Sequence, residues 1–267
     1  MNKSLNKSYM VNRQIVNQLS QVAGYLWEKG WAERNGGNIS YNLSEFASSL
    51  DSLPALSAPI AIGLAVPQLA GAYFLVTGTG RRMRYVASDP MDNMSVIRIL
   101  PNGEQYVIVA EKDIHPTSEL PTHLLVHQFL QTEKPDYKAV IHTHPIELVA
   151  MSHHRPFLEK DVLTNLLWSM IPETRAFCPK GLGIVPYTLP GSVELAQKTL
   201  TELHQYDVVM WEKHGVVAVG QDAVEAFDMI DVLNKSAQIY RDGCAMGFRP
   251  EGMTKAQMDE LKEAFNL

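Results

Sequence analysis

The N-terminal part of the chain alternates apolar and polar positions with the period of an α-helix. Apolar residues between positions 11 and 27 recur about every 3.6 residues and therefore share one face. They are Val11, Ile15, Val16, Leu19, Val22, Ala23, Leu26 and Trp27. Gly30 ends the run, so the pattern predicts an amphipathic first helix. Similar patterns predict helices after residue 121 through Leu130, over 193–204 and, as the last long helix, over 223–240.

Shorter apolar runs predict strands. One lies over 73–77, one ends near Tyr41, and the run AVIH at 139–142 is typical of a buried strand. Residues 95–100 and 105–110 flank Asn102 and Gly103, a pair that favours a hairpin because it accepts positive φ at low cost. Residues 208–220 predict two strands that reverse near 213–215, and residues 174–179 and 181–187 predict two more.

Strands and helices intermix along the chain, and the two predicted reversals indicate antiparallel pairing. We therefore expect an α/β fold in three layers, with a mostly antiparallel central sheet covered by helices on its faces. No internal repeat, low-complexity tract or linker-like segment divides the sequence. The simplest organisation is a single domain over residues 1–267.

Residues 52–80 carry no charged side chain, which raises the question of a membrane span, since a span needs about 20 apolar residues. Pro54, Pro59 and Pro67, together with Gly63 and Gly71, interrupt any continuous helix there. We interpret the segment as a buried loop that leads into the strand over 73–77.

Composition narrows the classes of function. The 267 residues include 23 Lys and Arg and 29 Asp and Glu, a formal charge of −6. An acidic balance gives no attraction to polyphosphate, which argues against nucleic-acid binding. Cys178 and Cys244 lack a CxxC spacing, which favours a reducing compartment, and the N-terminal residues lack the apolar core of a secretory signal. We expect a cytoplasmic protein that binds neither nucleic acid nor membrane.

Candidate metal ligands lie in VIHTHP. His142 and His144 are two residues apart on a predicted strand, so both imidazoles project from one face. Neutral imidazole suits Zn²⁺, and a catalytic site usually takes three protein ligands. His214, beside Gly215 at a predicted strand reversal, is the best third candidate. The alternative is that these are core histidines, each donating to a backbone carbonyl.

A second candidate feature is the helix start in PTSELP at 116–121. Thr117 and Ser118 can cap free amides, and such a helix start attracts anions. Glu119 then lies just inside the N-terminus of this predicted helix. Its carboxylate is either a functional group or simply an electrostatic cap for the helix.

The turns NGGN at 35–38 and TGTG at 77–80 are open to two interpretations. Each is either a sharp reversal alone or a concave set of backbone N–H groups that can hold a phosphate. Neither matches a Walker loop or a dinucleotide fingerprint. Arg81, Arg82 and Arg84 follow TGTG, and we expect them to form a solvated face or an oligomer contact.

Other histidines need separate explanations. His123 and His127 have the i, i+4 spacing that can chelate a metal, but no glutamate follows His123 as the zincin pattern requires. Packing, or a hydrogen bond that supports the first site, is the favoured role. His153 and His154 are typical of a surface loop.

Five segments, in this order, resemble the class II aldolase family, the zinc-dependent sugar-phosphate aldolases and epimerases. They are ERNGGNIS at 33–40, VTGTG at 76–80, PTSELP at 116–121, IHTHP at 141–145 and KHGVVAVG at 213–220. The resemblance runs from the first helix to about Gly247. It implies a class II aldolase-like fold, a small sugar-phosphate substrate and retro-aldol cleavage of a ketose 1-phosphate. Epimerases and dehydratases of the same family are the alternative activities, and a non-catalytic relative would lack the histidines or the glutamate.

The resemblance also implies roles for individual residues. His142, His144 and His214 would hold one zinc ion per subunit, and Glu119 would be the acid/base residue beside it. The phosphate-binding residues would be Asn35, Asn38, Thr79, Gly80, Thr117 and Ser118. Glu173 would be a second catalytic glutamate, offered to the site of a neighbouring subunit in a homotetramer with active sites at subunit interfaces. The sequence around Glu173 departs from the family pattern.

Overall fold

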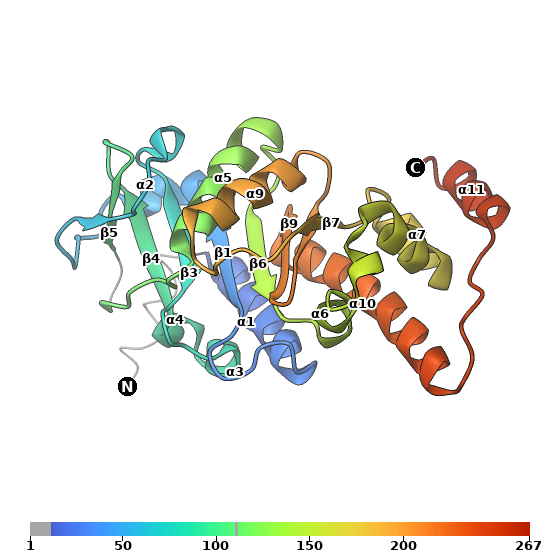
Figure 1. Ribbon diagram of the computed structural model, residues 1–267. Coiled ribbons are helices and arrows are strands. Elements are labelled where there is room, and N and C mark those ends of the chain that lie inside the picture. Colours follow the sequence, from blue (N-terminus) through green and yellow to red (C-terminus); the bar gives the residue numbers. More distant parts are fainter. Residues whose placement is uncertain (1–11, 110–111) are drawn as a thin grey trace.

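The computed structural model describes residues 12–109 and 112–267. In that part of the chain, nine strands form one sheet through the centre of the molecule (Figure 1). They are β1 (Asn38–Asn42), β2 (Ile60–Ala61), β3 (Tyr73–Thr77), β4 (Met94–Ile99), β5 (Gln105–Ile108), β6 (Ala139–Thr143), β7 (Gly183–Val185), β8 (Val208–Trp211) and β9 (Gly215–Gly220). Their order is β2-β5-β4-β3-β1-β6-β9-β8-β7. Among the strands of the described residues, only β7 and β8 pair parallel, which confirms the prediction of a mostly antiparallel sheet.

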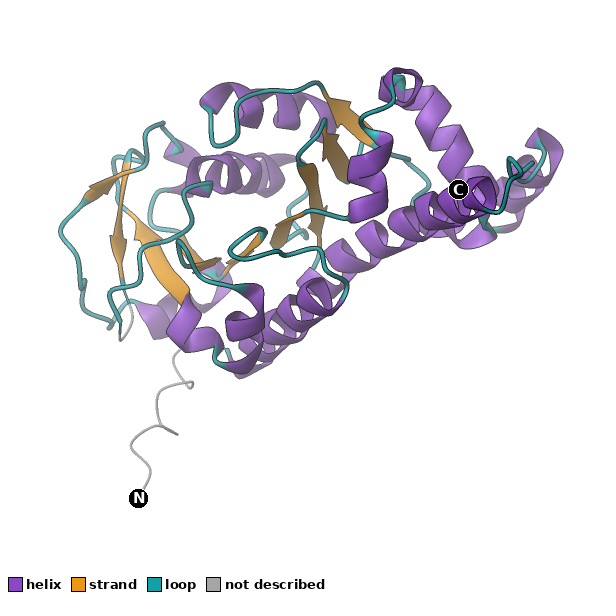
Figure 2. Ribbon diagram, turned by 60° about the horizontal axis from the view of Figure 1, so that its bottom comes forward, coloured by secondary structure: helices purple, strands orange, loops and turns teal. Residues whose placement is uncertain are grey.

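Helices cover both faces of the sheet, as predicted. The helices are α1 (Arg13–Glu28), α2 (Ala47–Leu50), α3 (Met83–Ser88), α4 (Pro90–Asn93), α5 (Leu120–Glu133), α6 (Ile146–Met151), α7 (Lys160–Met170), α8 (Pro172–Phe177), α9 (Val193–Leu203), α10 (Ala223–Ala245) and α11 (Lys255–Ala264). Short 3₁₀ turns add η1 (Ser44–Phe46), η2 (Pro67–Leu69) and η3 (Arg155–Leu158). α5 and α9 lie on one face, and α1 and α10 lie on the other (Figures 1 and 2).

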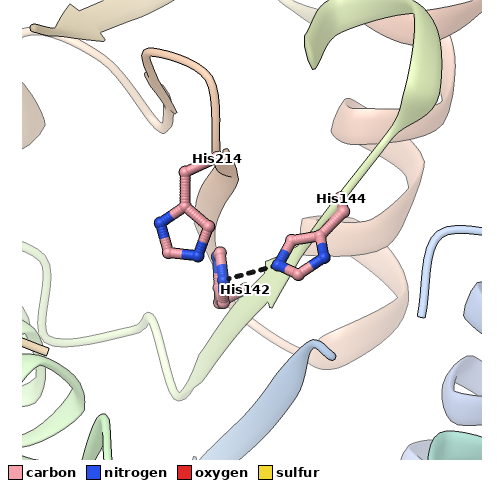
Figure 3. A group of neighbouring side chains, drawn as sticks. All are labelled: His142, His144 and His214. Carbon is pink, nitrogen blue, oxygen red and sulfur yellow. Dashed lines mark hydrogen bonds between the residues drawn. The ribbon is translucent and has the colours of Figure 1, made fainter. Parts of the chain in front are cut away.

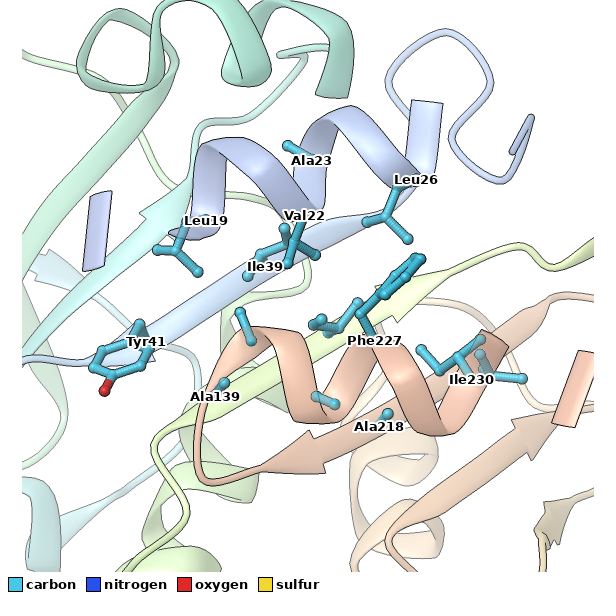
Figure 4. Close-up of a cluster of buried hydrophobic side chains, with 14 of the residues drawn as sticks. Leu19, Val22, Ala23, Leu26, Ile39, Tyr41, Ala139, Ala218, Phe227 and Ile230 are labelled. Atoms are coloured by element: carbon cyan, nitrogen blue, oxygen red, sulfur yellow. The ribbon is translucent and has the colours of Figure 1, made fainter. Parts of the chain in front are cut away.

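The two faces of the central strands carry different side chains. Ile39 and Tyr41 of β1 point to α1 and α10, where Leu26 and Phe227 complete an apolar cluster (Figure 4). Because strand residues alternate, Asn38 and Ser40 point to the opposite face, toward α5. The central strand thus contributes its apolar residues to the core and its polar residues to a site on the α5 side.

The first helix forms as predicted. Asn12 caps it by accepting a hydrogen bond from the backbone N of Gln14, and Gly30 follows its end with φ of 72°. Six of the predicted face residues are buried, and they are Ile15, Val16, Leu19, Val22, Ala23 and Leu26. Trp27 is 39% exposed, and Val11 lies outside the described residues.

The uncharged segment is not the buried loop that we expected. Much of it is exposed, and four apolar side chains, Leu53, Ile62, Val66 and Leu69, anchor it to the body of the protein. The prolines and glycines explain the difference, because a chain broken so often exposes backbone that must bond to water. Among the described residues, no helix combines the length and the apolar character that crossing a bilayer requires.

Both predicted reversals are present. β4 and β5 form a hairpin around Gly103, whose φ is 66°. β8 and β9 reverse through Lys213, which adopts a φ of 60°. Residue 110, at the end of the predicted second strand, lies outside the described residues.

One expectation near the C-terminus was wrong, and the last long helix extends beyond its predicted end. Residues 174–179 do not form a strand, since most of them belong to helix α8, which begins at Pro172, a residue preorganised for a first turn. A hydrogen bond between the hydroxyls of Thr174 and Ser236 joins this helix to α10. In addition, α10 continues to Ala245, and α11 follows it behind a capping box of Thr254 and Gln257.

Candidate active site

Three histidines come together from two strand ends. His142 is near the end of β6, His144 follows that strand, and His214 lies in the turn between β8 and β9. One ring nitrogen from each lies within 4.8 Å of the others, and Figure 3 shows the three rings facing a common space. The spacing within VIHTHP and the turn beside Gly215 therefore produce the juxtaposition that we anticipated.

Gly215 permits this approach. A Cβ at that position would lie 2.7 Å from His144 Cδ2 and 3.0 Å from His142 Cε1, and closer still to the carbonyl oxygen of Thr143. Because backbone cannot yield as a flexible side chain does, only glycine fits between the histidine strand and this turn.

The hydrogen bonds of the rings leave two lone pairs facing each other. His142 Nδ1 donates to the carbonyl oxygen of Val216 at 2.9 Å, and His144 Nδ1 donates to Glu33 Oε1 at 2.8 Å. Neither acceptor can donate, so each neutral ring presents an unprotonated Nε2. These two Nε2 atoms are 3.2 Å apart, and the dashed line in Figure 3 joins them. When both rings are neutral, neither Nε2 has a hydrogen to donate to the other, and a cation beside them would make the contact favourable.

The ring of His214 is also consistent with metal binding. His214 Nδ1 is buried and has no hydrogen-bond partner among the described residues. Burial lowers the pKa of His142 to about 3 and that of His214 to about 4, so both rings are in the neutral form that binds metals. The donor set therefore suits a divalent transition metal better than it suits a core of satisfied histidines.

Glu119 lies beside the histidines. Its Oε2 is 3.7 Å from His142 Nε2 and accepts a hydrogen bond of 2.8 Å from Asn38 Nδ2. Glu119 occupies the N-cap position of α5, yet its carboxylate makes no capping bond. Neither Thr117 nor Ser118 is the N-cap residue, although Thr117 Oγ1 accepts from the backbone N of Glu119 at 3.3 Å. The carboxylate therefore faces the site rather than the free amides of its helix.

The two glycine-containing turns meet at the same cavity, of about 150 Å³. Its lining consists of Asn35, Gly36, Gly37, Asn38, Thr77, Gly78, Thr79, Gly80, Arg81, Thr117, Ser118, Glu119, His142, His144 and His214. All of the candidate phosphate-binding residues are included. β1 pairs with β6 so that Asn38 lies opposite His142, which places the NGGN turn directly beside the histidines.

Some placements differ from the sequence-based expectations. Arg81, which we assigned to a solvated face or an oligomer contact, lines this cavity. Its position directly after TGTG is the sequence feature that could have indicated this placement. Glu33 lies within a motif that we recognised, but its contact with His144 joins residues far apart in the sequence. Glu173 is exposed on α8 and does not line the cavity of its own chain.

Four other histidines and one cysteine do not belong to the group of three clustered histidines. His123 and His127 are buried and hydrogen-bond to Ser40, which is the kind of packing and supporting contact that we favoured for them. His153 and His154 are exposed. Burial raises the pKa of the Cys178 thiol to about 12, which leaves it an unreactive thiol.

Comparisons with known proteins extend over nearly the whole chain. Residues 17–241 match the family model described as the class II aldolase and adducin N-terminal domain. The chain is 58% identical to a rhamnulose-1-phosphate aldolase from Bacteroides thetaiotaomicron, covering 98% of this chain and 99% of that protein. It is 34% identical to a rhamnulose-1-phosphate aldolase from Enterococcus faecalis, with coverages of 95% and 91%. The crystal structure of a sugar-phosphate aldolase from Thermotoga maritima superposes with a TM-score of 0.76 at 35% identity, covering 90% of this chain and 99% of that one.

Proposed function

The chain belongs to the class II aldolase and adducin family, and from that premise we propose that it is an aldolase acting on L-rhamnulose 1-phosphate. The products would be dihydroxyacetone phosphate and L-lactaldehyde, in a reversible reaction. The names of the two rhamnulose-1-phosphate aldolases support this substrate. The segments WAERNGGN at 31–38 and GLGIVP at 181–186 also resemble that enzyme more than other members of the family.

One observation carries the proposal. The carboxylate of Glu119 lies 3.7 Å from His142 in a cavity that also holds both glycine-containing turns. An acid/base group, a metal-binding set and a nest of backbone amides thus converge on one small space. Metal-assisted cleavage of a phosphorylated ketose uses all three.

We propose that His142, His144 and His214 hold a single Zn²⁺ ion. Their neutral nitrogens and their number match a catalytic zinc site with one position left open. A divalent ion there supplies Lewis acidity for the negative charge that develops on the C2 oxygen of the ketose.

In the proposed reaction, Glu119 moves the proton at C3. When the C3–C4 bond breaks, its electron pair passes to C3 and the C2 oxygen as an enediolate, and the aldehyde leaves. Glu119 then delivers a proton to C3, and it removes that proton in the synthetic direction. A carboxyl group positioned as a general acid and base increases the reaction rate by about 10²- to 10⁴-fold.

The two turns and the PTSELP segment bind the phosphate. Backbone N–H groups and the hydroxyls of Thr79, Thr117 and Ser118 face the cavity together with Asn35 and the positively charged Arg81. Holding the phosphate fixes the position of C3 relative to Glu119, so this binding energy is used for orientation.

We propose further that Glu173 serves a neighbouring subunit of a cytoplasmic homotetramer. Its exposure on α8 and its absence from the cavity of its own chain support a role across an interface. It would accept the proton of the C4 hydroxyl. Mass photometry of the purified protein tests the tetramer, and a monomeric population would contradict it.

The substrate is tested by incubating the metal-loaded protein with L-rhamnulose 1-phosphate and measuring dihydroxyacetone phosphate with a coupled dehydrogenase. L-Fuculose 1-phosphate and L-ribulose 5-phosphate serve as comparison substrates. Release from L-rhamnulose 1-phosphate at the highest kcat/KM supports the proposal. Triose phosphate from fuculose phosphate alone, or epimerisation of the pentulose phosphate without cleavage, would replace it with another activity of the family.

A further inference from the structure

A buried row of hydrogen bonds runs from Glu119 away from the cavity into the layer between β1 and α5. Asn38 Nδ2 donates to Glu119 Oε2 at 2.8 Å, and Asn38 Oδ1 contacts His123 Nε2. On the other side of that ring, His123 Nδ1 lies 2.6 Å from the hydroxyl of Ser40. The same hydroxyl lies 2.8 Å from His127 Nε2.

The row of hydrogen bonds depends on equal spacing of two residues on strand β1 and two residues on helix α5. Asn38 and Ser40 are two apart on a strand, which separates them by about 6.6 Å on one face. His123 and His127 are four apart on a helix, which separates them by about 6 Å on one face. The two strand residues therefore meet the two helix residues at the same spacing.

The direction of the hydrogen bonds follows from the acceptor at the end of the row. The Glu119 carboxylate accepts, so Asn38 presents its NH₂ group to Glu119 and its oxygen to His123. His123 must then carry its hydrogen on Nε2 and accept at Nδ1, which makes the Ser40 hydroxyl the donor to His123. Ser40 in turn accepts from His127 Nε2. Every group donates toward Glu119.

Burial supports this assignment. His123 and His127 are 2% and 1% exposed, and Ser40 is fully buried. Loss of hydration lowers the pKa of His123 to about 4 and that of His127 well below its ordinary value, so both rings are neutral. The remaining nitrogen, His127 Nδ1, has no partner among the described residues and is left as a lone pair rather than as an N–H group.

We propose that His123 is a positioning residue for the reaction: by donating to Asn38 Oδ1, with its tautomer fixed by Ser40, it holds the Asn38 amide against the Glu119 carboxylate. This inference rests on the proposed function only for the role of Glu119. With the other tautomer, two lone pairs would meet at Asn38 Oδ1, and Asn38 would leave Glu119. His127 lies one step further away and completes the bonding of Ser40 without touching Asn38.

The test compares three variants of the metal-loaded protein. His123→Phe keeps a ring but removes the donor, and His123→Gln replaces the ring with an amide donor. His127→Phe makes the same ring exchange one step further from Asn38. The readout is exchange of deuterium from solvent into the hydroxymethyl carbon of dihydroxyacetone phosphate, followed by NMR. This exchange reports the Glu119 proton step without an aldehyde. Metal content and the melting temperature are measured alongside.

We expect His123→Phe to slow the exchange on the order of 10²-fold, as a misplaced catalytic group does, with metal content unchanged. His123→Gln should recover at least tenfold of that loss. His127→Phe should lower the melting temperature comparably but slow the exchange less than threefold. If His123→Phe does not fold, Ser40→Ala replaces it and should slow the exchange about tenfold.

Three results would overturn the inference. They are exchange by His123→Phe or its substitute within threefold of the wild type, an equal loss in His127→Phe, and a crystal structure of His123→Phe with Asn38 still bonded to Glu119. The crystallographic result does not depend on the substrate. Failure of the wild-type protein to cleave L-rhamnulose 1-phosphate would instead overturn the proposed substrate and leave this test intact.

Discussion

His144 and Glu33 are joined by a hydrogen bond of 2.8 Å, from the ring Nδ1 to the carboxylate Oε1. The two residues come from the loop before β1 and the segment after β6, which lie together because β1 and β6 are paired. A histidine that binds a metal through one nitrogen commonly donates its other N–H to a carboxylate, which fixes the ring and increases its basicity. Glu33 therefore orients the ring of His144 and would strengthen the binding of a metal by the three histidines.

Replacing Glu33 with Gln should weaken metal binding. The amide oxygen still accepts from His144, but the negative charge that favours the bound cation is lost. Loss of a residue that hydrogen-bonds to a metal ligand lowers metal affinity by about 10- to 100-fold. We expect a decrease near tenfold for Glu33→Gln, because the Glu33 side chain is 67% exposed. Competition with a chelator of known affinity measures the change.

Two further variants calibrate that measurement. Glu28→Gln removes an exposed carboxylate near the end of α1 and should bind metal as the wild type does. His144→Ala removes a ligand and should lose metal and activity together. An affinity of Glu33→Gln equal to that of Glu28→Gln would exclude a role for the Glu33 charge.

Glu119→Gln should separate metal binding from catalysis. Gln retains an oxygen that accepts from Asn38 Nδ2, so the fold and the histidines stay in place. It cannot take up or deliver a proton, so kcat should fall by about 10² to 10⁴. Steady-state kinetics and metal analysis of the same preparation measure both effects. Wild-type turnover in this variant would remove Glu119 from the mechanism.

The metal-free protein should lose stability on mild acidification. Histidines in the unfolded chain take up protons near pH 6.5, whereas burial lowers the folded-state pKa of His123 to about 4 and of His142 to about 3. The unfolded state therefore binds more protons between these values, and stability falls as pH decreases through that window. Between pH 6.5 and pH 5, His123 and His142 together lower the free energy of unfolding by up to roughly 3 kcal/mol.

Urea denaturation of the chelated protein at pH 7, 6 and 5 measures this dependence. His123→Gln should show a shallower decrease than the wild type, because one of the two groups no longer titrates. His153→Gln, which changes an exposed ring, should follow the wild-type curve. A free energy of unfolding that stays constant from pH 7 to pH 5 would contradict the assignment of neutral buried rings.

Local patterns predicted much of the sheet and indicated which three histidines come together. The strand over 73–77, the hairpin around Gly103 and the reversal beside His214 follow from apolar runs and from residues that accept positive φ. The two-residue spacing of His142 and His144 already placed both rings on one face. Helix α8 was missed because TRAFCP is short and contains residues that also favour strands, while its helical state depends on packing against α10.

Contacts between distant segments could not be predicted in the same way. The pairing of Asn38 with His142 and the row through Ser40 depend on β1 lying between β3 and β6, which no local pattern specifies. The side chain of Asn38 was expected at the phosphate, and its bonds to Glu119 and His123 emerged only from that register. Motif order indicated which residues meet, but the strand register determines what each one touches.

Gly215→Ala should disturb the arrangement of the three histidines and weaken metal binding. The added Cβ would approach the Thr143 carbonyl oxygen and lie 2.7 Å from His144 Cδ2, so the β8–β9 turn must move away from β6. His214 moves with it, and a catalytic zinc site does not tolerate the loss of one of three ligands. We expect at least a tenfold loss of metal affinity and a lower melting temperature.

Gly24→Ala is the matched control, because its Cβ would lie 3.7 Å from Ala87 Cβ in a helix that favours alanine by about 1 kcal/mol. Gly24→Ala should keep full metal affinity and gain stability, and equal metal binding by the two variants would show that the close approach at Gly215 does not position His214.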